Sequence, residues 1–101
     1  MIGMEIIETR NGKELTIALE GELNSATAPQ LEAFISESLH DVESLIVDLG
    51  KVSYLSSAGL RELLIAKKVL GRNGTMIIKN AQPAVMDVFQ ITGFSNIFDI
   101  Q

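Results

Sequence analysis

Two adjacent serines, Ser56 and Ser57, follow an apolar segment at 45–49 and precede a leucine-rich segment with helical spacing. They lie where a strand is expected to give way to a helix, and sites in open α/β sheets gather at such strand ends. A hydroxyl at a helix start can cap the helix, act as a nucleophile, or carry a phosphate that the helix dipole tolerates. For Ser57 the residues alone leave the cap and the phosphate acceptor open, with Ser56 as the competing acceptor.

Nucleophilic catalysis is the least favoured of these chemistries. A catalytic serine needs a base and a group that orients the base. The single histidine, His40, follows the first expected helix and lies far from the serines on the expected topology. Ser57-Ala58-Gly59 lacks the strained Gly-x-Ser-x-Gly turn, and the sequence has no glycine-rich phosphate loop and no cluster of metal ligands. We therefore expect no catalytic residues, metal or cofactor, and no enzymatic activity.

Hydrophobic periodicity predicts the elements that position the serines. Two strands alternate in the half-buried pattern and are joined at Asn11-Gly12, which favours a type I′ hairpin turn. The run at 45–49 is unbroken and apolar, which is typical of a strand covered on both faces and followed here by a short connection. The predicted strands are 4–9, 15–20, 45–49, 75–79 and 97–100, and the predicted helices are 27–39, 58–71 and 83–92, the last ended by Gly93.

This order, ββαβαβα with a short terminal strand, predicts an α/β fold. Helices that alternate with strands imply parallel crossovers, so the expected sheet is mixed, with an N-terminal hairpin and covering helices. The chain has 101 residues without a linker or repeat, which predicts one domain over 1–101.

The amino-acid composition limits the kinds of partner that the chain is expected to bind. Thirteen acidic residues against eight lysines and arginines give a net charge of −5, which disfavours nucleic-acid binding. No apolar run approaches the roughly 20 residues of a membrane helix, and residues 1–4 do not resemble a signal peptide. Together with the absence of cysteine, these features predict a cytoplasmic protein that does not insert into membranes and binds other proteins.

A second polar segment precedes the first predicted helix. Asn24, Ser25 and Thr27 are turn and cap residue types, and Pro29 fits a first helical turn. They are also candidates for a second contact patch, because this loop is expected to lie near the serine loop.

The run from Leu45 to Leu63 resembles the signature of the STAS domain, the domain of sulphate transporters and anti-sigma-factor antagonists. Residues 19–24 resemble the family's strand and turn before the first helix. Residues 80–85, followed by 91–94, resemble its last passage from strand to helix. The resemblance covers roughly residues 4–100, and its three motifs occur in the family's order.

The resemblance implies an anti-sigma-factor antagonist of a bacterial signalling circuit. In that family, the unphosphorylated antagonist binds a kinase-type anti-sigma factor and frees a sigma factor. Phosphorylation of one serine abolishes binding, and a serine phosphatase restores it. Alignment on Gly59 and Leu60 implies that Ser57 is the phosphorylated residue, with Ser56 in place of the usual Asp and Ala58 in place of a second hydroxyl residue.

The resemblance also implies a partner-binding surface, in which Asn24 replaces the Asp of many antagonists. Its candidate residues are Asn24, Ser25, Thr27, Ser56, Ser57, Ala58, Gly59 and Arg61. Two alternatives keep the fold and change the function. One is a STAS accessory subunit that regulates the ATPase of an ABC-type lipid transporter, and the other is a ligand-sensing STAS module.

Overall fold

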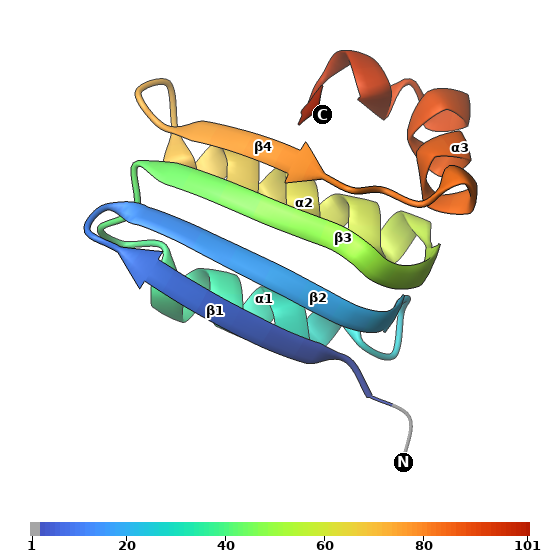
Figure 1. Cartoon of the computed structure of the whole chain (residues 1–101), viewed down its shortest axis with the longest axis horizontal. Coiled ribbons are helices and arrows are strands. Elements are labelled where there is room, and N and C mark those ends of the chain that lie inside the picture. The colour runs from blue at the N-terminus through green and yellow to red at the C-terminus, as the bar shows by residue number, and fades with distance from the viewer. Residues whose placement is uncertain (1–2) are drawn as a thin grey trace.

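The chain forms one sheet with the strand order β1-β2-β3-β4-β5, seen in a computed structural model that describes residues 3–101 (Figure 1). β1 (Glu5–Asn11) pairs antiparallel with β2 (Glu14–Leu23), and the remaining neighbours pair in parallel. These are β3 (Ser44–Leu55), β4 (Thr75–Lys79) and β5 (Asp99–Ile100). The predicted mixed sheet with an N-terminal hairpin is therefore confirmed.

Three α-helices join or follow the parallel strands in the described part of the chain. They are α1 (Ala28–Ser38), α2 (Ser57–Leu70) and α3 (Pro83–Thr92), and α3 leads into a short 3-10 helix, η1 (Phe94–Asn96). The helix predictions agree with these bounds to within a residue, and the predicted stop at Gly93 is confirmed by its φ of 81°. None of the described helices has the length and apolar character needed to cross a membrane.

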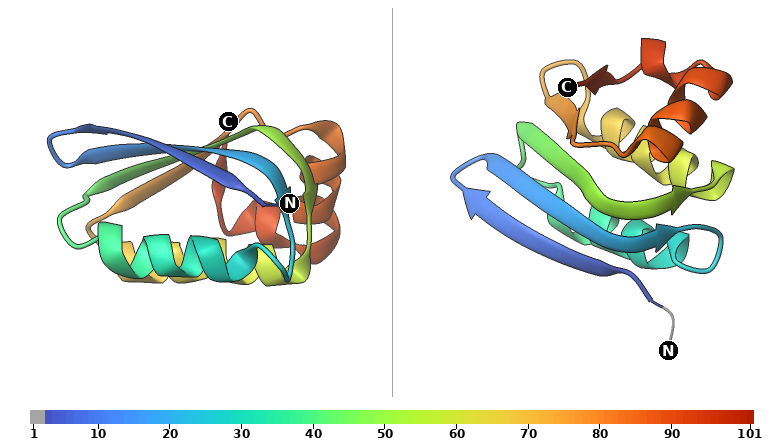
Figure 2. Two further views of the ribbon diagram at one scale, coloured as in Figure 1. Left: turned by 90° about the horizontal axis from the view of Figure 1, so that it is seen from below. Right: turned by 45° about the vertical axis from the view of Figure 1, so that its right-hand side comes forward.

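α1 and α2 lie side by side under one face of the sheet, and the opposite face of β2 and β3 carries no helix (Figure 2, left). In β3, Leu45, Val47 and Leu49 are buried against the helices, whereas Ile46 and Asp48 are only half-buried. The prediction that this strand is covered on both faces is wrong. Each new strand is added on the same side of its predecessor, so successive crossovers of one hand place both helices on the same face.

β3 is also longer than predicted, because two irregularities let it continue past Leu49. Its register against β2 shifts between Ala18 and Glu20 and again between Gly21 and Glu22. Each shift gives β3 one more residue than β2, which is the pattern of a β-bulge. The predicted connection between strand and helix is therefore reduced to one residue: Leu55 ends the strand, Ser56 is the N-cap, and the helix begins at Ser57.

The hairpin turn differs from the prediction too. Asn11 still pairs with Glu14, so the two turn residues are Gly12 and Lys13. Gly12 has φ of 63°, and Lys13 is not among the residues with positive φ. A single positive φ at the first central position is the pattern of a type II′ turn, not of type I′.

The core lies between the sheet and the helices. Its fully buried side chains come from β2, β3 and β4 and from α1, α2 and α3, including Leu19, Val47, Leu63, Ile78 and Phe89. Phe89 also packs edge to face on Phe98, with ring centroids 5.8 Å apart. This contact attaches the C-terminal segment to the core.

Candidate functional site

The two serines play different roles at the start of α2. Ser56 is the N-cap residue, with extended backbone, and its Oγ accepts a hydrogen bond from the Gly59 N–H at 3.5 Å. Ser57 is the first residue of the helix and is exposed. The alternative in which Ser57 caps the helix is therefore wrong, because Ser56 holds that position. The hydroxyl of Ser57 stands free at the surface.

The N-terminal end of α2, where Ser57 lies, favours negative charge. The first turn of α2 contains no acidic residue, and its leading N–H groups have no carbonyl one turn before them to bind. The positive end of the helix dipole adds to this effect. Arg61 is exposed and lies one turn further along, on the helix face that Ser57 occupies. A phosphate on Ser57 would meet donors and a cation of its own chain.

The loop before α1 is held by its own side chains. Asn24 Oδ1 accepts hydrogen bonds from the N–H groups of Ala26, at 2.9 Å, and Thr27, at 3.1 Å. Thr27 Oγ1 donates to the Glu22 carbonyl at 2.7 Å and accepts from the Asn24 N–H at 2.9 Å. This asparagine turn leaves Ser25 exposed at the tip of the loop.

The loop before α1 and the start of α2 lie together, as the sequence predicted. The Ser56 N–H donates to the Leu23 carbonyl at 2.9 Å. Gly59 packs so closely that a Cβ there would lie 2.5 Å from Leu23 Cγ and 2.8 Å from Leu55 Cδ1. Real Cβ atoms essentially never lie so close to other atoms, so any larger residue at this position would force Leu23 and Leu55 to move.

Between the two helix starts lies a surface hollow of about 220 Å³, here called the α1–α2 hollow. It is lined by residues of the loop, of α1 and of α2, namely Ser25, Ala28, Pro29, Glu32, Ala58, Arg61 and Glu62. Three of the predicted contact residues, Ser25, Ala58 and Arg61, thus share one recess beside Ser57.

The eight predicted contact residues divide by exposure. Ser25, Ser57 and Arg61 are exposed, and Asn24, Ser56 and Ala58 are half-buried. Thr27 and Gly59 are buried. They support the site without being exposed in it: Thr27 through its hydrogen bonds in the loop, and Gly59 through its close packing against Leu23 and Leu55.

Two residues of this region were not predicted. Tyr54 is 52% exposed beside Glu22, because the second irregularity of β3 turns both Ser53 and Tyr54 outward. Glu62 is only 5% exposed. The spacing of Ala58, Glu62 and Ala66 is the one available signal for Glu62, since residues four apart share a helix face.

Glu62 has an unusual environment for a carboxylate. Its Oε1 is buried and has no hydrogen-bond partner among the described residues. Burial raises the pKa of this carboxyl above its ordinary value, Glu32 raises it further by charge repulsion, and Arg61 partly offsets both. The α1–α2 hollow is therefore lined by a carboxyl group that lacks a hydrogen-bond partner at Oε1.

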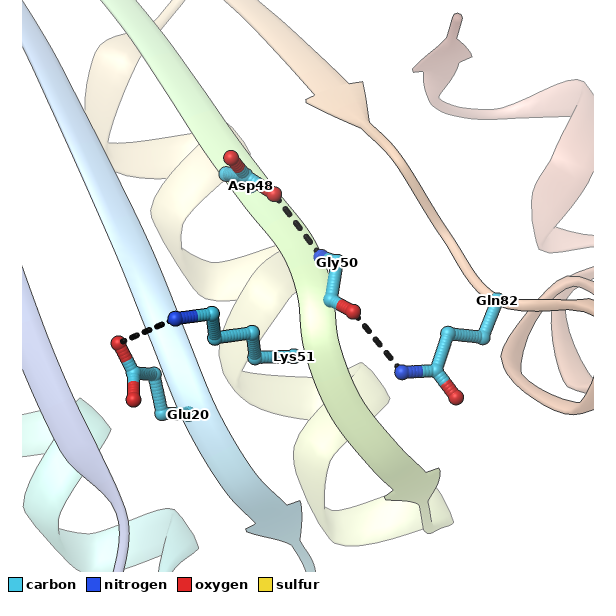
Figure 3. Close-up of polar contacts among 5 residues, drawn as sticks. All are labelled: Glu20, Asp48, Gly50, Lys51 and Gln82. Carbon is cyan, nitrogen blue, oxygen red and sulfur yellow. Dashed lines mark hydrogen bonds and ion pairs between the residues drawn. The ribbon is translucent and has the colours of Figure 1, made fainter.

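A second polar cluster lies on the uncovered face of the sheet, at the first irregularity of β3 (Figure 3). Asp48 Oδ1 accepts from the Gly50 N–H at 2.9 Å, and Gln82 Nε2 donates to the Gly50 carbonyl at 2.8 Å. Lys51 Nζ lies 3.8 Å from Glu20 Oε2. The two contacts with Gly50 satisfy its backbone N–H and carbonyl at the irregularity, and Asp48 lies within the strand.

Other chemistry receives no geometric support in the part of the chain that the structure describes. His40 follows the C-terminal end of α1, near the start of β3, whereas Ser57 follows the far end of that strand. No group of three or more histidine, cysteine, aspartate or glutamate side chains among the described residues could hold a metal ion.

Comparisons with known proteins agree on one family. The model of the STAS domain matches residues 5–101. A putative anti-sigma factor antagonist, BtrV of Bordetella bronchiseptica, is 42% identical over 88 residues, which are 85% of this chain and 76% of the relative. The anti-sigma-B factor antagonist of Listeria monocytogenes is 32% identical over 102 residues, covering 99% of this chain and 89% of the relative.

Solved structures of anti-sigma factor antagonists have the same fold as this chain. An anti-sigma factor antagonist from Mycobacterium paratuberculosis superposes with a TM-score of 0.88 and 26% identity, over 96% of this chain and 84% of the other. The unphosphorylated form of the anti-sigma factor antagonist SpoIIAA superposes with a TM-score of 0.83 and 25% identity, over 96% of this chain and 88% of the other.

Proposed function

We propose that this chain, which belongs to the STAS domain family and resembles its anti-sigma-factor antagonists, binds a kinase-type anti-sigma factor. Phosphorylation of Ser57 switches that binding off, and a serine phosphatase restores it. Binding frees the sigma factor that the kinase would otherwise hold, so the chain acts on transcription through a protein partner in the cytoplasm. The named relatives favour this function over a transporter subunit or a ligand sensor, since they are themselves anti-sigma factor antagonists.

The observation that carries the proposal is that the two serines have different structural roles. Ser56 holds the N-cap, so Ser57 is exposed with its hydroxyl uncommitted. Ser56 is half-buried and faces the Gly59 N–H, which makes it the poorer substrate. That SpoIIAA is described in an unphosphorylated form supports a phosphorylation switch in this family.

The energetics favour a switch that blocks binding without unfolding the domain. The start of α2 accommodates about −1.5 to −2 of added charge through its N–H groups and dipole. A partner surface fitted to a neutral hydroxyl would have to bury that charge unpaired, at a cost of several kcal/mol. Since 1.4 kcal/mol is tenfold in affinity, a cost of about 4 kcal/mol weakens binding roughly a thousandfold.

The test uses the partner itself. Wild-type and Ser57→Asp protein are used to capture proteins from the native cell lysate, and mass spectrometry identifies what only the wild type retains. The purified kinase is then incubated with the chain and Mg-ATP, and the modified residue is mapped. We expect a kinase-type anti-sigma factor and phosphate on Ser57. Modification of Ser56 alone would refute the assignment, and capture of a transporter ATPase would refute the function.

A further inference from the structure

We infer that the α1–α2 hollow receives a basic side chain of the protein partner, and that Glu62 is the residue that pairs with it. This inference rests on the proposed function, because it adds a specificity contact to the surface around Ser57. Three features carry it: an unpaired buried carboxylate, a recess of matching size, and the charge of the residues around the recess.

The first feature is the unpaired carboxylate. Glu62 is 5% exposed, and its Oε1 has no hydrogen-bond partner among the described residues. The ion pairs within the described residues are Lys13–Glu43 and Lys51–Glu20, so Arg61 forms no ion pair with Glu62, although it precedes Glu62 in α2 and lines the same hollow. A buried carboxylate without a partner is costly in the free chain. A donor supplied by another molecule would remove that cost.

The second feature is the recess. The α1–α2 hollow has a volume of about 220 Å³, which suits one long side chain and is too small for a helix. Glu62 lines it, together with Ser25 from the loop and Ala58 beside Ser57. A side chain that enters here therefore belongs to whatever molecule covers Ser57, and the small Ala58 leaves the way to Glu62 open.

The third feature is the charge. Glu32 of α1 stands on the opposite wall, and its charge reinforces that of Glu62. Carboxylates accept hydrogen bonds and donate none when ionised, so the complement is a group rich in donors with a positive charge. Arginine fits best, because its planar guanidinium forms two parallel hydrogen bonds to a carboxylate and is weakly hydrated. Lysine would supply the charge without that geometry.

The experiment titrates the purified kinase-type anti-sigma factor with four forms of the chain. These are the wild type, Glu62→Gln, Ser57→Asp and the matched control Glu37→Gln. Glu37 is exposed near the C-terminal end of α1 and does not line the hollow, so it reports the effect of the same charge change elsewhere. Calorimetry gives the affinities, and urea unfolding shows whether each form is folded.

We expect Glu62→Gln to lower the affinity roughly 30-fold or more, as loss of one member of a buried charge pair does. Glu37→Gln should stay within about twofold. Arginine-to-alanine substitutions across the kinase surface should then reveal one that costs as much and that adds no further loss in combination with Glu62→Gln. Wild-type affinity in Glu62→Gln, or strictly additive losses for every arginine and lysine tested, would overturn the inference.

The outcomes separate this inference from the function on which it rests. If wild-type chain does not bind the kinase at all, the proposed function fails. If wild type binds, Ser57→Asp does not, and Glu62→Gln binds as wild type does, the function stands and only the paired contact is wrong.

Discussion

The backbone N–H of Ser56 donates to the carbonyl of Leu23 at 2.9 Å, which ties the start of α2 to the end of β2. Leu23 immediately precedes the loop that carries Asn24 and Ser25. The loop before α1 and the start of α2 are therefore held in a fixed position relative to each other and form a single surface.

Replacement of Ser57 tests the switch. Ser57→Ala should bind the kinase constitutively, because it cannot be phosphorylated. Ser57→Asp should bind at least roughly tenfold more weakly, since it places a charge where the partner expects a hydroxyl. Calorimetric titration measures both affinities. Ser36→Asp, an equivalent change on the exposed side of α1, is the control and should bind as wild type does. Ser57→Asp should melt near the wild-type temperature, and a large drop in its melting temperature would argue against a purely local switch.

Replacement of Ser56 tests the cap. Ser56→Ala removes the side-chain acceptor for the Gly59 N–H, so the free energy of unfolding should fall by about 0.5–1 kcal/mol. For a domain of this size, that lowers the melting temperature by roughly 2–8 °C. Ser57→Ala should change the melting temperature much less. A larger loss in Ser57→Ala than in Ser56→Ala, by thermal unfolding, would contradict the assignment of the cap.

Gly59→Ala tests the close packing of α2. Alanine is the better helix former by about 1 kcal/mol, but its Cβ would overlap the buried side chains of Leu23 and Leu55. Overpacking costs about 1–3 kcal/mol, so the net effect should be destabilising. Gly3→Ala is the control, since nothing lies within 4 Å of a Cβ there. Urea unfolding that showed Gly59→Ala to be as stable as wild type would mean that the helix can move away from the sheet.

Glu62→Met tests the cost of the buried carboxylate through its pH dependence. The pKa of Glu62 is raised above 4.5 in the folded chain by burial and by Glu32, against the opposing effect of Arg61. The folded state therefore binds the proton more tightly than the unfolded state, and its stability falls as the pH rises above about 4.5. Methionine has no such proton, so the variant should gain about 1–3 kcal/mol over wild type at pH 7 and much less at pH 4.

Urea unfolding at both pH values measures this difference. Glu37→Met is the control, because Glu37 is exposed and the same substitution there removes no buried charge. An equal gain for Glu62→Met at pH 4 and pH 7 would show that the carboxylate is not what limits stability.

Sequence periodicity predicted the elements best where turn residues enclose them. The strand 75–79 follows Gly74, the helix 83–92 begins at Pro83 and ends before Gly93, and both have the predicted bounds. β3 was cut short in the prediction because its two extra residues break the alternation after Leu49. Burial there falls on Val52 and Leu55, a spacing that no strand period describes. Only pairing with β2, which the sequence does not display, defines that register.

Some residues of the candidate site could likewise be predicted from the sequence, and others could not. Ser57 was predicted to be the phosphorylated residue because of its position in the family motif, and this stays a prediction. The nearness of the loop to α2 was predicted from the topology, and the structure confirms it. The choice of cap could not be predicted, since adjacent serines have equal propensity and the backbone decides which one faces the Gly59 N–H. Glu62 was missed because charged residues are rarely buried, so its type predicted a solvent-facing side chain.

The strand order β1-β2-β3-β4-β5 follows the order of the chain, so each strand pairs with the one made just before it. Pairing with the strand that precedes it in sequence closes the shortest loop that each crossover allows, which limits the entropy lost in closing that loop. Every residue of the surface around Ser57 lies between Leu23 and Glu62. The elements that carry this surface, β2, α1, β3 and the start of α2, are consecutive along the chain, so the surface is assembled without any contribution from β4, α3 or β5.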